Sequence, residues 1–538
     1  MKGGYCMPKN TDSKQMSKFY SLPNQGLRSY FGNVQKGQPE VYDTPFAKGE
    51  STKHLLSAWN EVLLSIKDKW PSLYEFEMDM AGKVGPLSVM LPLEERMADI
   101  DAYYQGIHLP SEPLDERAVK AVTAEWGHAS TLRRRNRQDT ISAMRLSTNS
   151  GSPYFTKRRT VLGKSVPFTV MREGAKVLQN LPDFKGEACA VLGWRGQEGG
   201  YSKDDVKQRV VWMFPFVVNV DELTVYQPGI EYAQRRGLVP AWIGNDEVDK
   251  VMTRLFDTKG ENDLVIATDF TKFDQHFNSS LQDAAKTIIA SRFNNDASMT
   301  QWLEKVYPIK YMIPLNYAWG KVKYGLHGMG SGSGGTNFDE TIAHRALQYE
   351  AAMARGSRLN PNSQCLGDDG VITYPGITVE DVIRSYTSHG LEMNDQKQYA
   401  STIDTVYLRR WHHKNYRDNG VCVGVYATMR ALGRMRYLER FMNPEIWDAE
   451  AVELRYYSIL ENLKWHPLRE QFVDFCMKRD KYRLGIDIPH FLDNLTKITQ
   501  EKIDVMPEFL GWRATLNKKS DKAYGIADWW IVKYLKDK

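Results

Sequence analysis

The most constraining feature of the sequence is a pair of adjacent aspartates in a turn bounded by glycines. Residues 364–366 and 371–374 are short apolar segments, and Gly367-Asp368-Asp369-Gly370 separates them. Two such segments around a Gly/Asp turn predict a β-hairpin with Asp368 and Asp369 at its tip. Adjacent carboxylates repel each other unless a cation neutralises them, and a hard divalent ion with oxygen ligands is the usual solution. The alternative is a surface turn in which Gly and Asp serve the backbone alone.

A second pair of aspartates follows a short β-type run. Leu264–Thr268 ends abruptly at Asp269, and Asp274 comes five positions later. A strand that ends at an acidic residue places the carboxylate where open sheets bind ligands. The alternative is an aspartate that caps the following turn.

A glycine-rich loop, Gly325–Gly335, lies between these two acidic segments and leads directly into a helix. Glycines let the backbone approach a ligand, and hydroxyls at Ser331 and Thr336 can hydrogen-bond a sugar or a base. The helix is predicted from the apolar stripe of Phe338, Ile342, Ala346, Tyr349 and Met353, and Gly356 can end it. A flexible linker is the alternative, although a linker needs neither fixed hydroxyls nor an immediate helix.

The order of the three segments is more informative than any one of them. Asp269 and Asp368 are 99 positions apart, which leaves room for intervening helices to bring them together. In this order the segments resemble motifs A, B and C of the viral RNA-dependent RNA polymerases. Lys207-Gln208-Arg209 resembles motif F, and Asn149–Pro153 resembles the motif G loop. Lys397 is in the place of motif D, and Tyr407–Arg410 is similar to motif E. The amino-acid sequence of motif B most resembles that of the picobirnavirus enzymes, with partitivirus enzymes as near relatives.

The resemblance implies RNA synthesis on an RNA template by nucleotidyl transfer with two Mg²⁺ ions, for which Mn²⁺ can substitute. Asp269 and Asp368 would bridge the ions, Asp369 would be a secondary ligand, and Lys397 would donate a proton to pyrophosphate. The residues implied in nucleotide binding are Lys207, Arg209, Asp274, Ser331, Thr336 and Glu340.

One position departs from the family pattern. The motif B helix usually carries Asn four residues after its Thr, and this chain has Glu340. In the family this Asn helps to sense the ribose 2′-hydroxyl through the second motif A aspartate, here Asp274. Two carboxylates cannot pair in that way unless one is protonated or a water or hydroxyl bridges them.

A basic stretch from Arg133 to Lys164 has no acidic run nearby, so it is either a solvated face or a track for phosphates. Template contact through phosphates is expected, with strong salt dependence. The residues assigned to RNA binding are Arg133, Arg134, Arg135, Ser150, Gly151, Arg158, Arg159 and Arg409.

The expected fold is α+β, since periodicity alone indicates mixed helix and strand. The resemblance implies a right-hand polymerase with a ferredoxin-like antiparallel palm, fingers, a largely helical thumb and a closed, encircled active site. The expected units are an N-terminal arm (1–55), fingers (56–254), palm motif A (255–278), a fingers insertion (279–322), palm motifs B to E (323–435) and thumb (436–538).

Composition excludes a disordered chain, a collagen and a small disulfide scaffold, because 42% of the 538 residues are hydrophobic and 25% are charged. Five scattered cysteines without a CxxC pair predict reduced thiols and no structural zinc. The net charge of +5 does not identify a nucleic-acid binder. No signal peptide or membrane span is expected, since the longest apolar run, Val210–Val218, is interrupted by Pro215.

The expected partners are template and product RNA and nucleoside triphosphates. The resemblance allows a viral capsid protein as a further partner and implies a monomer inside the viral particle and the host cytoplasm. Two alternatives stay open: a non-catalytic RNA-binding or capsid-associated protein on a degenerate polymerase fold, and a reverse transcriptase. A reverse transcriptase would normally carry an aromatic residue at Asp274.

Overall fold

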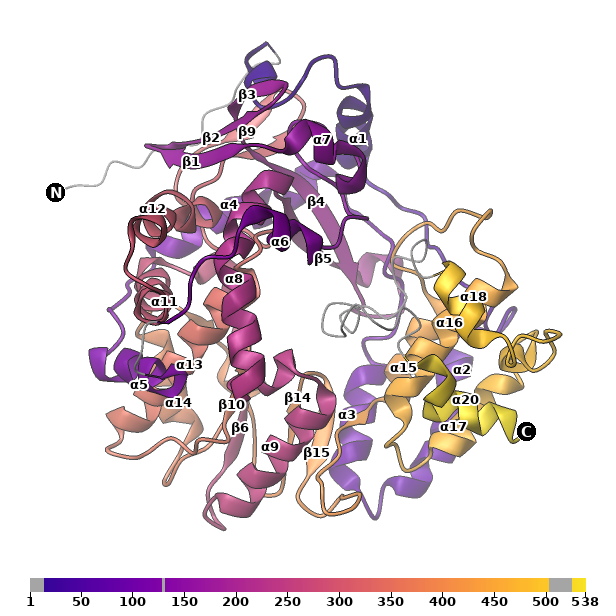
Figure 1. Cartoon of the computed structure of the whole chain (residues 1–538). Helices are drawn as coiled ribbons and strands as arrows, with labels where there is room; N and C mark the ends of the chain where they lie inside the picture. The colour runs from indigo at the N-terminus through magenta and orange to yellow at the C-terminus, as the bar shows by residue number, and fades with distance from the viewer. Residues whose placement is uncertain (1–13, 128–130, 503–524) are drawn as a thin grey trace.

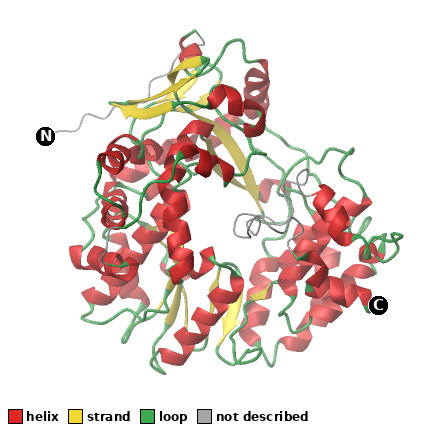
Figure 2. Cartoon of the chain, in the orientation of Figure 1, coloured by secondary structure: helices red, strands yellow, loops and turns green. Residues whose placement is uncertain are grey.

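The computed structural model describes residues 14–127, 131–502 and 525–538, and their helices and sheets form a ring in the view of Figure 1. Figure 2 shows two groups of strands on opposite sides of this ring. One group contains β4 and β5, and the other contains β6, β10, β14 and β15. The acidic segments belong to the second group.

The sheet that carries the acidic segments has the antiparallel strand order β10-β11-β6-β13, with bounds Gln364–Leu366, Asp369–Ile372, Val265–Thr268 and Tyr399–Ser401. Two smaller antiparallel sheets are β12-β7 (Glu392–Met393, Phe270–Thr271) and β14-β15-β16 (Asp404–Tyr407, Arg410–His413, Val425–Tyr426). The hairpin predicted around residues 364–374 is confirmed as β10 and β11.

The sheets on the opposite side have the orders β5-β4-β8-β9 and β1-β2-β3. The bounds of the first are Lys207–Met213, Ala190–Gln197, Leu315–Ala318 and Lys321–Lys323, and β4 and β8 run parallel. Those of the second are Thr169–Glu173, Lys176–Leu181 and Phe184–Glu187. The apolar run Val210–Val218 divides at Pro215, which is the N-cap of the helix that follows β5.

The helices of the first half are α1 (Gln25–Lys36), α2 (Thr52–Leu63), α3 (Pro71–Ala81), α4 (Leu93–Gln105), α5 (Glu116–Trp126), α6 (Arg137–Ser142), α7 (Leu162–Ser165), α8 (Phe216–Arg236) and α9 (Asn245–Thr258). Those of the second half are α10 (Phe273–His276), α11 (Ser279–Arg292), α12 (Ala297–Lys305), α13 (Thr336–Ala354), α14 (Val379–Thr387), α15 (Thr428–Arg436), α16 (Ala449–Leu460), α17 (Arg469–Met477), α18 (Leu495–Lys502) and α20 (Trp530–Lys536). None of these described helices has the length and apolar character needed to cross a membrane.

Helix α13 follows the predicted stripe closely. It starts at Thr336, and Gly356 ends its last turn with φ +63°, a conformation that glycine adopts without strain. It packs against α5, α11, α14 and β10. Asn278 caps helix α11, because its side chain accepts a hydrogen bond from the Ser280 N–H.

The N-terminal helices pack with the C-terminal ones. Residues from Phe46 to Leu87 share a hydrophobic core with α15 to α20. Within it, the Trp59 indole donates to the Thr428 hydroxyl at 2.7 Å, and the Glu77 carboxylate accepts from the Thr428 hydroxyl and N–H. The expected unit 56–254 therefore spans two cores, because the long-range packing of α2 and α3 leaves no trace in local sequence patterns.

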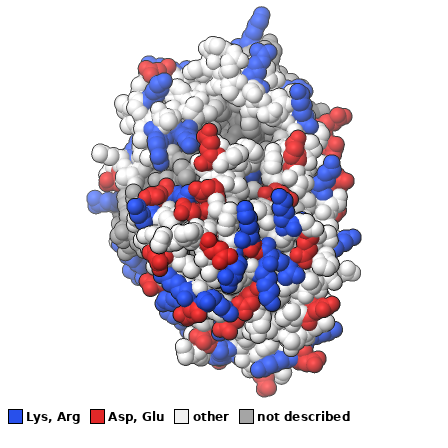
Figure 3. Space-filling model, turned by 90° about the vertical axis from the view of Figure 1, so that its right-hand side faces the viewer, with Lys and Arg blue, Asp and Glu red and all other residues white. Residues whose placement is uncertain are grey.

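Charges on the face formed by the C-terminal helices are mixed. Figure 3 shows Lys and Arg interspersed with Asp and Glu there. The four described cysteines, Cys189, Cys365, Cys422 and Cys476, are free and buried, whereas Cys6 lies outside the described residues.

Candidate active site

Strand pairing brings the two acidic segments together. In the antiparallel ladder of β6 and β11, Thr268 pairs with Gly370. The next position along this register sets Asp269 opposite Asp369, and Asp368 is the turn residue beside them. Two acids separated by about a hundred residues thus meet at one end of a single sheet.

The electrostatics of these carboxylates confirm their proximity. Partial loss of hydration inside the protein raises the pKa of the Asp368 carboxyl group, and the negative charges of Asp274 and Asp269 raise it further. Burial, and then the charge of Asp368, raises the pKa of Asp369 to about 7. Asp369 also accepts a hydrogen bond from the Leu408 N–H at 2.8 Å. The side chains of Asp269 and Asp368 remain exposed to solvent.

Basic side chains surround the carboxylate cluster. Partial loss of hydration raises the pKa of Asp269. The positive charges of Lys397, Lys83 and Lys207 oppose this rise, Lys397 most strongly and Lys207 least. The positive charge of Arg209 opposes the rise in the pKa of Asp368, and that of Arg409 opposes the rise in the pKa of Asp369. The structure therefore gathers the basic residues assigned to motifs F, D and E around the acids. Lys83, at the end of α3, was missed, because a single lysine in a loop carries no pattern.

Glu340 and Asp274 form a carboxyl pair. Glu340 is buried on α13, and burial followed by the charge of Asp274 raises its pKa well above the ordinary value. Oε1 of Glu340 is buried and has no hydrogen-bond partner among the described residues. Two ionised carboxylates this close repel each other, so burial and the charge of Asp274 both favour the neutral form of Glu340. The neutral form removes the repulsion that an acid at the usual Asn position would otherwise cause.

The hydroxyls of the glycine-rich loop have different surroundings. The Ser331 hydroxyl accepts a hydrogen bond from the Trp212 N–H on β5 at 3.2 Å, which joins the loop to the strand of Lys207 and Arg209. The Thr336 hydroxyl donates to Gly330 O at 3.1 Å and thereby closes the loop on itself. Sequence reasoning missed Glu222 of α8, whose buried carboxylate accepts from the Gly334 N–H at 3.1 Å and from the Ser333 hydroxyl.

Gln398 is a further site residue that sequence reasoning missed. Its side-chain oxygen accepts from the Asp269 N–H at 2.8 Å, and its amide donates to Asp269 O at 2.9 Å. It follows Lys397 directly, so one short segment supplies both a cation for the cluster and a clamp for the strand end. A half-buried glutamine in a loop gives no sequence signal for such a role.

The donor set suits a divalent metal. Within residues 14–127, 131–502 and 525–538, no group of three or more His, Cys, Asp or Glu side chains has the spacing of a ready metal site. Asp269, Asp368 and Asp369 nevertheless offer hard oxygen donors, and repulsion from neighbouring carboxylates adds to the burial that raises the pKa values of Asp368 and Asp369. A divalent cation would remove this repulsion, and carboxylate oxygens are the ligands that Mg²⁺ prefers, so the residues present fit the ion.

The basic stretch is more engaged with protein than its sequence indicates. Arg135 forms an ion pair with Glu231 at 2.5 Å, and Arg137 forms one with the buried Asp221 at 2.8 Å. Arg134 donates to the Thr224 hydroxyl at 3.2 Å, and Arg158 to the Asn219 side chain at 2.7 Å. These partners all lie on α8, so the acids that the local sequence lacks come from a distant helix. Arg133 and Arg159 are exposed.

The loop assigned to motif G is held mainly by its own backbone. Ser150 is buried, and its hydroxyl accepts from the Thr156 N–H at 3.2 Å. Gly151 has φ +60°, and a Cβ there would lie 2.5 Å from Phe214 O, so only glycine fits. Arg409, in the segment assigned to motif E, is half exposed and lies 3.6 Å from Glu198.

Comparisons with known proteins agree with this site. A family model described as viral RNA-dependent RNA polymerase matches residues 94–461. A human picobirnavirus protein described as a potential RNA-dependent RNA polymerase is 55% identical over 526 residues, which are 97% of this chain and 98% of that protein.

Solved structures give the same result. The crystal structure of the RNA-dependent RNA polymerase of a human picobirnavirus matches with a TM-score of 0.94 and 54% identity, covering 98% of this chain and 100% of that one. An insertion loop deletion mutant of such a polymerase matches with a TM-score of 0.91 and 52% identity, with the same coverage. The expected α+β class is confirmed, and the likeness implies a right-hand polymerase fold. By its sequence, its structure and its cluster of acids, this chain belongs to the viral RNA-dependent RNA polymerases, the enzymes that copy viral RNA, and is similar over nearly its whole length to those of human picobirnaviruses.

Proposed function

We propose that the chain extends RNA by a two-metal nucleotidyl transfer in which Asp269 and Asp368 hold both divalent ions. The observation that carries this proposal is the meeting of the two acidic segments at one end of the sheet. Bound Mg²⁺, or Mn²⁺ in its place, would activate the 3′-hydroxyl and neutralise the leaving pyrophosphate. Asp369, whose carboxylate already accepts from Leu408, would support Asp368 or serve as a secondary ligand.

The basic residues around the acids would bind the triphosphate. Lys207 and Arg209 lie on β5 with exposed side chains, close enough to influence Asp269 and Asp368 respectively. Their charges would offset those of the phosphates and hold the α-phosphate in line with the attacking oxygen. Lys397 would deliver a proton to the leaving pyrophosphate, and its influence on Asp269 supports this position beside the reaction.

The carboxyl pair of Glu340 and Asp274 would recognise the ribose of the incoming nucleotide. With Glu340 in its neutral form, the side chain of Asp274 would accept a hydrogen bond from the ribose 2′-hydroxyl. Ser331 would add a second polar contact from the loop. Thr336 would act indirectly, because its hydroxyl already donates a hydrogen bond to Gly330 O within that loop.

Template RNA would bind through its phosphates. Arg133, Arg159 and Arg409 are the assigned arginines whose side chains are exposed or half exposed, so we propose them as the direct contacts. Arg134, Arg135 and Arg158 would shape the same surface from beneath, since α8 holds them. The backbone conformation of Ser150 and Gly151 would hold the motif G loop in the shape that contacts the template.

The finer architecture belongs to the same proposal. The antiparallel sheet of β6, β10, β11 and β13, with α11 and α13, would be the ferredoxin-like palm of a right hand with a closed, encircled active site. The two sheets on the opposite side of the ring, β5-β4-β8-β9 and β1-β2-β3, would belong to the fingers. The core shared by α2, α3 and α15 to α20 supports a thumb that includes N-terminal helices.

The decisive experiment measures incorporation of labelled nucleotides on an RNA template with Mg²⁺ or Mn²⁺. Asp368→Ala should abolish incorporation and leave RNA affinity near that of the wild type, because the loss removes a metal ligand and not an RNA contact. Asp183→Ala, at the turn between β2 and β3, is the matched control and should stay active. Substantial synthesis by Asp368→Ala would refute the metal assignment.

The same assay separates the alternatives. RNA binding without incorporation by the wild type would favour the non-catalytic protein, and preference for deoxynucleotides would favour a reverse transcriptase. A monomeric state and a capsid-protein partner inside the particle also belong to the proposal. Light scattering of the purified chain and co-purification with the capsid protein test them.

A further inference from the structure

The turn that carries Asp368 is anchored on both sides of Gly367 by one helix. Gly367 has φ +58°, and its N–H donates to the Thr341 hydroxyl at 2.9 Å. Its carbonyl oxygen lies 2.9 Å from Nδ1 of His344, and a carbonyl can only accept, so Nδ1 donates. Thr341 and His344 are three positions apart on α13 and therefore face the same side. Both peptide units that flank Gly367 are thus fixed, although glycine by itself is the least constrained residue.

The His344 ring also lies beside both acidic segments. It is fully buried, and its centroid lies 5.3 Å from that of Phe270, which directly follows Asp269. A Cβ on Gly370 would lie 2.6 Å from Cε1 of His344, so the ring packs directly on β11 beside Asp369. One side chain of α13 therefore sets the spacing between the two acidic segments. Burial lowers the pKa of His344 to about 4, which keeps the ring neutral with one hydrogen for Gly367.

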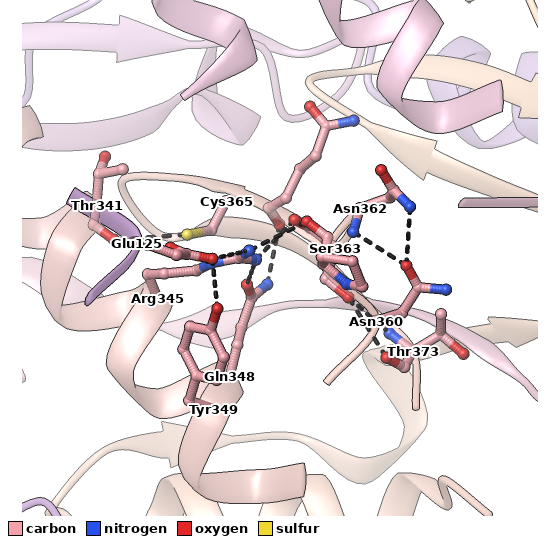
Figure 4. Close-up of polar contacts among 12 residues, drawn as sticks. Glu125, Thr341, Arg345, Gln348, Tyr349, Asn360, Asn362, Ser363, Cys365 and Thr373 are labelled. Atoms are coloured by element: carbon pink, nitrogen blue, oxygen red, sulfur yellow. Dashed lines mark hydrogen bonds and ion pairs between the residues drawn. The ribbon is translucent and has the colours of Figure 1, made fainter. Parts of the chain in front are cut away.

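The rest of the hairpin is anchored to the next turn of the same helix. Figure 4 shows Arg345 and Gln348 pointing from α13 toward the backbone of β10 and the segment before it. Gln348 donates to Gln364 O at 3.0 Å and to Val371 O at 3.3 Å, one on each strand. Arg345 donates to Ser363 O at 2.7 Å and is itself held by Glu125 at 2.6 Å. The hairpin backbone thus lies on a polar face of α13 and cannot shift along it without losing several hydrogen bonds.

We propose that Thr341 and His344 are positioning residues for RNA synthesis, which set the place of Asp368 by holding both peptide units of Gly367. The inference rests on the proposed role of Asp368 as a metal ligand. Neither residue contacts substrate. Their effect passes through the turn, and a displacement of about 1 Å there is enough to impair catalysis strongly.

The test substitutes Thr341 without changing its volume. Thr341→Val removes the acceptor of the Gly367 N–H, whereas Thr341→Ser keeps it. We expect Thr341→Val to lower kcat at least 10-fold and to weaken Mn²⁺ binding several-fold, measured by calorimetry without RNA or nucleotide. Thr341→Ser should stay within about threefold of the wild type on both measures. Thr499→Val is the matched control, because within the described part of the chain the hydroxyl of this buried threonine bonds only inside its own helix, at 2.7 Å to Leu495 O.

Thr341→Cys adds a graded comparison that does not depend on stability. Its thiol is a weaker acceptor than a hydroxyl, so kcat and Mn²⁺ affinity should fall in the order Ser, Cys, Val. An order that follows the melting temperatures of the variants would overturn the inference, as would wild-type kcat and Mn²⁺ affinity in Thr341→Val. If Asp368→Ala were inactive while Thr341→Val worked normally, the metal assignment would stand and only the positioning role would fail. Substantial activity in Asp368→Ala would remove the proposed function itself.

Discussion

Gln398 holds the backbone of Asp269 at both of its polar groups, with distances of 2.8 Å to the N–H and 2.9 Å to the carbonyl oxygen. The same amide also donates to Asn394 O at 2.9 Å. The segment that carries Lys397 is therefore tied to the end of β6 through one side chain. The proposed proton donor, Lys397, and the proposed metal ligand, Asp269, are thus held in a fixed relation.

Gln398→Ala should reduce nucleotide incorporation about 10- to 100-fold. Removal of the amide frees Asp269 from its clamp and loosens Lys397, so two groups of the reaction lose their positions together. Steady-state kinetics should show the loss mainly in kcat, because the exposed residues that bind the triphosphate are unchanged.

Gln396→Ala is the control for that substitution, since Gln396 is exposed and lies in the same short turn. Its kinetics should match those of the wild type. Equal losses in both variants would mean that the segment as a whole, and not the clamp on Asp269, is responsible.

Asp274→Ala should lower the discrimination between ribonucleotides and deoxyribonucleotides by about 10- to 100-fold, the effect of losing one buried hydrogen bond to a charged group. Glu340→Gln should retain discrimination within about threefold, because the amide is neutral, as the protonated carboxyl is. Competition between NTP and dNTP in single-turnover incorporation measures both.

Glu350→Gln provides the comparison on the same helix, since the carboxylate of Glu350 bonds His389 at 2.6 Å and not a residue of the carboxyl pair. If Glu340→Gln lost discrimination as Asp274→Ala did, the negative charge of Glu340 rather than its proton would be the feature that matters.

The local elements of the site could be predicted, because each has a short-range cause. The strand before Asp269, the hairpin around Asp368 and the helix from Thr336 all follow from apolar period and glycine placement. The three polymerase motifs came from their order along the chain. Their convergence on one sheet end needed the register of β6 and β11, which the sequence does not state.

The remaining features depend on contacts between distant segments. The pairing of Arg135 and Arg137 with acids of α8 joins residues 96 and 84 positions apart, and the packing of α2 against α15 joins Trp59 to Thr428, 369 positions away. Gln398 and Lys83 are polar residues in loops, where many identical residues have no role. For these features the sequence contains no periodic signal, and only the folded arrangement identifies them.

Arg159→Ala should weaken RNA binding and reduce the slope of log affinity against log salt by about 1, because one phosphate contact is lost. Arg158→Ala should instead lower the melting temperature, since the Arg158 guanidinium bonds Asn219 at 2.7 Å and lies over the Phe216 ring at 5.5 Å. Fluorescence anisotropy at several salt concentrations and thermal unfolding separate the two effects. An unchanged salt slope in Arg159→Ala would remove this residue from the proposed track.

A second carboxyl pair lies far from the active site, in the C-terminal core. Glu453 of α16 is fully buried, and burial followed by Asp480 raises its pKa to about 10. Asp480 accepts from the N–H groups of Tyr482 at 3.1 Å and Leu484 at 2.8 Å, whereas neither carboxyl oxygen of Glu453 has a hydrogen-bond partner among the described residues. Folding therefore requires Glu453 to take up a proton at neutral pH.

Glu453→Gln should stabilise the protein, and the gain should grow with pH. In the wild type, the contribution of Glu453 to the free energy of unfolding is fully present below its ordinary pKa of 4.5 and is lost as pH rises toward 10. The loss is about 1.4 kcal/mol per pH unit in that window. Glutamine is neutral without taking up a proton, so between pH 6 and pH 8 the variant should gain on the order of 2 to 3 kcal/mol over the wild type. Chemical denaturation at both pH values measures this, with Glu470→Gln on the exposed side of α17 as the control. A pH-independent difference between Glu453→Gln and the wild type would show that Glu453 is ionised in the folded protein.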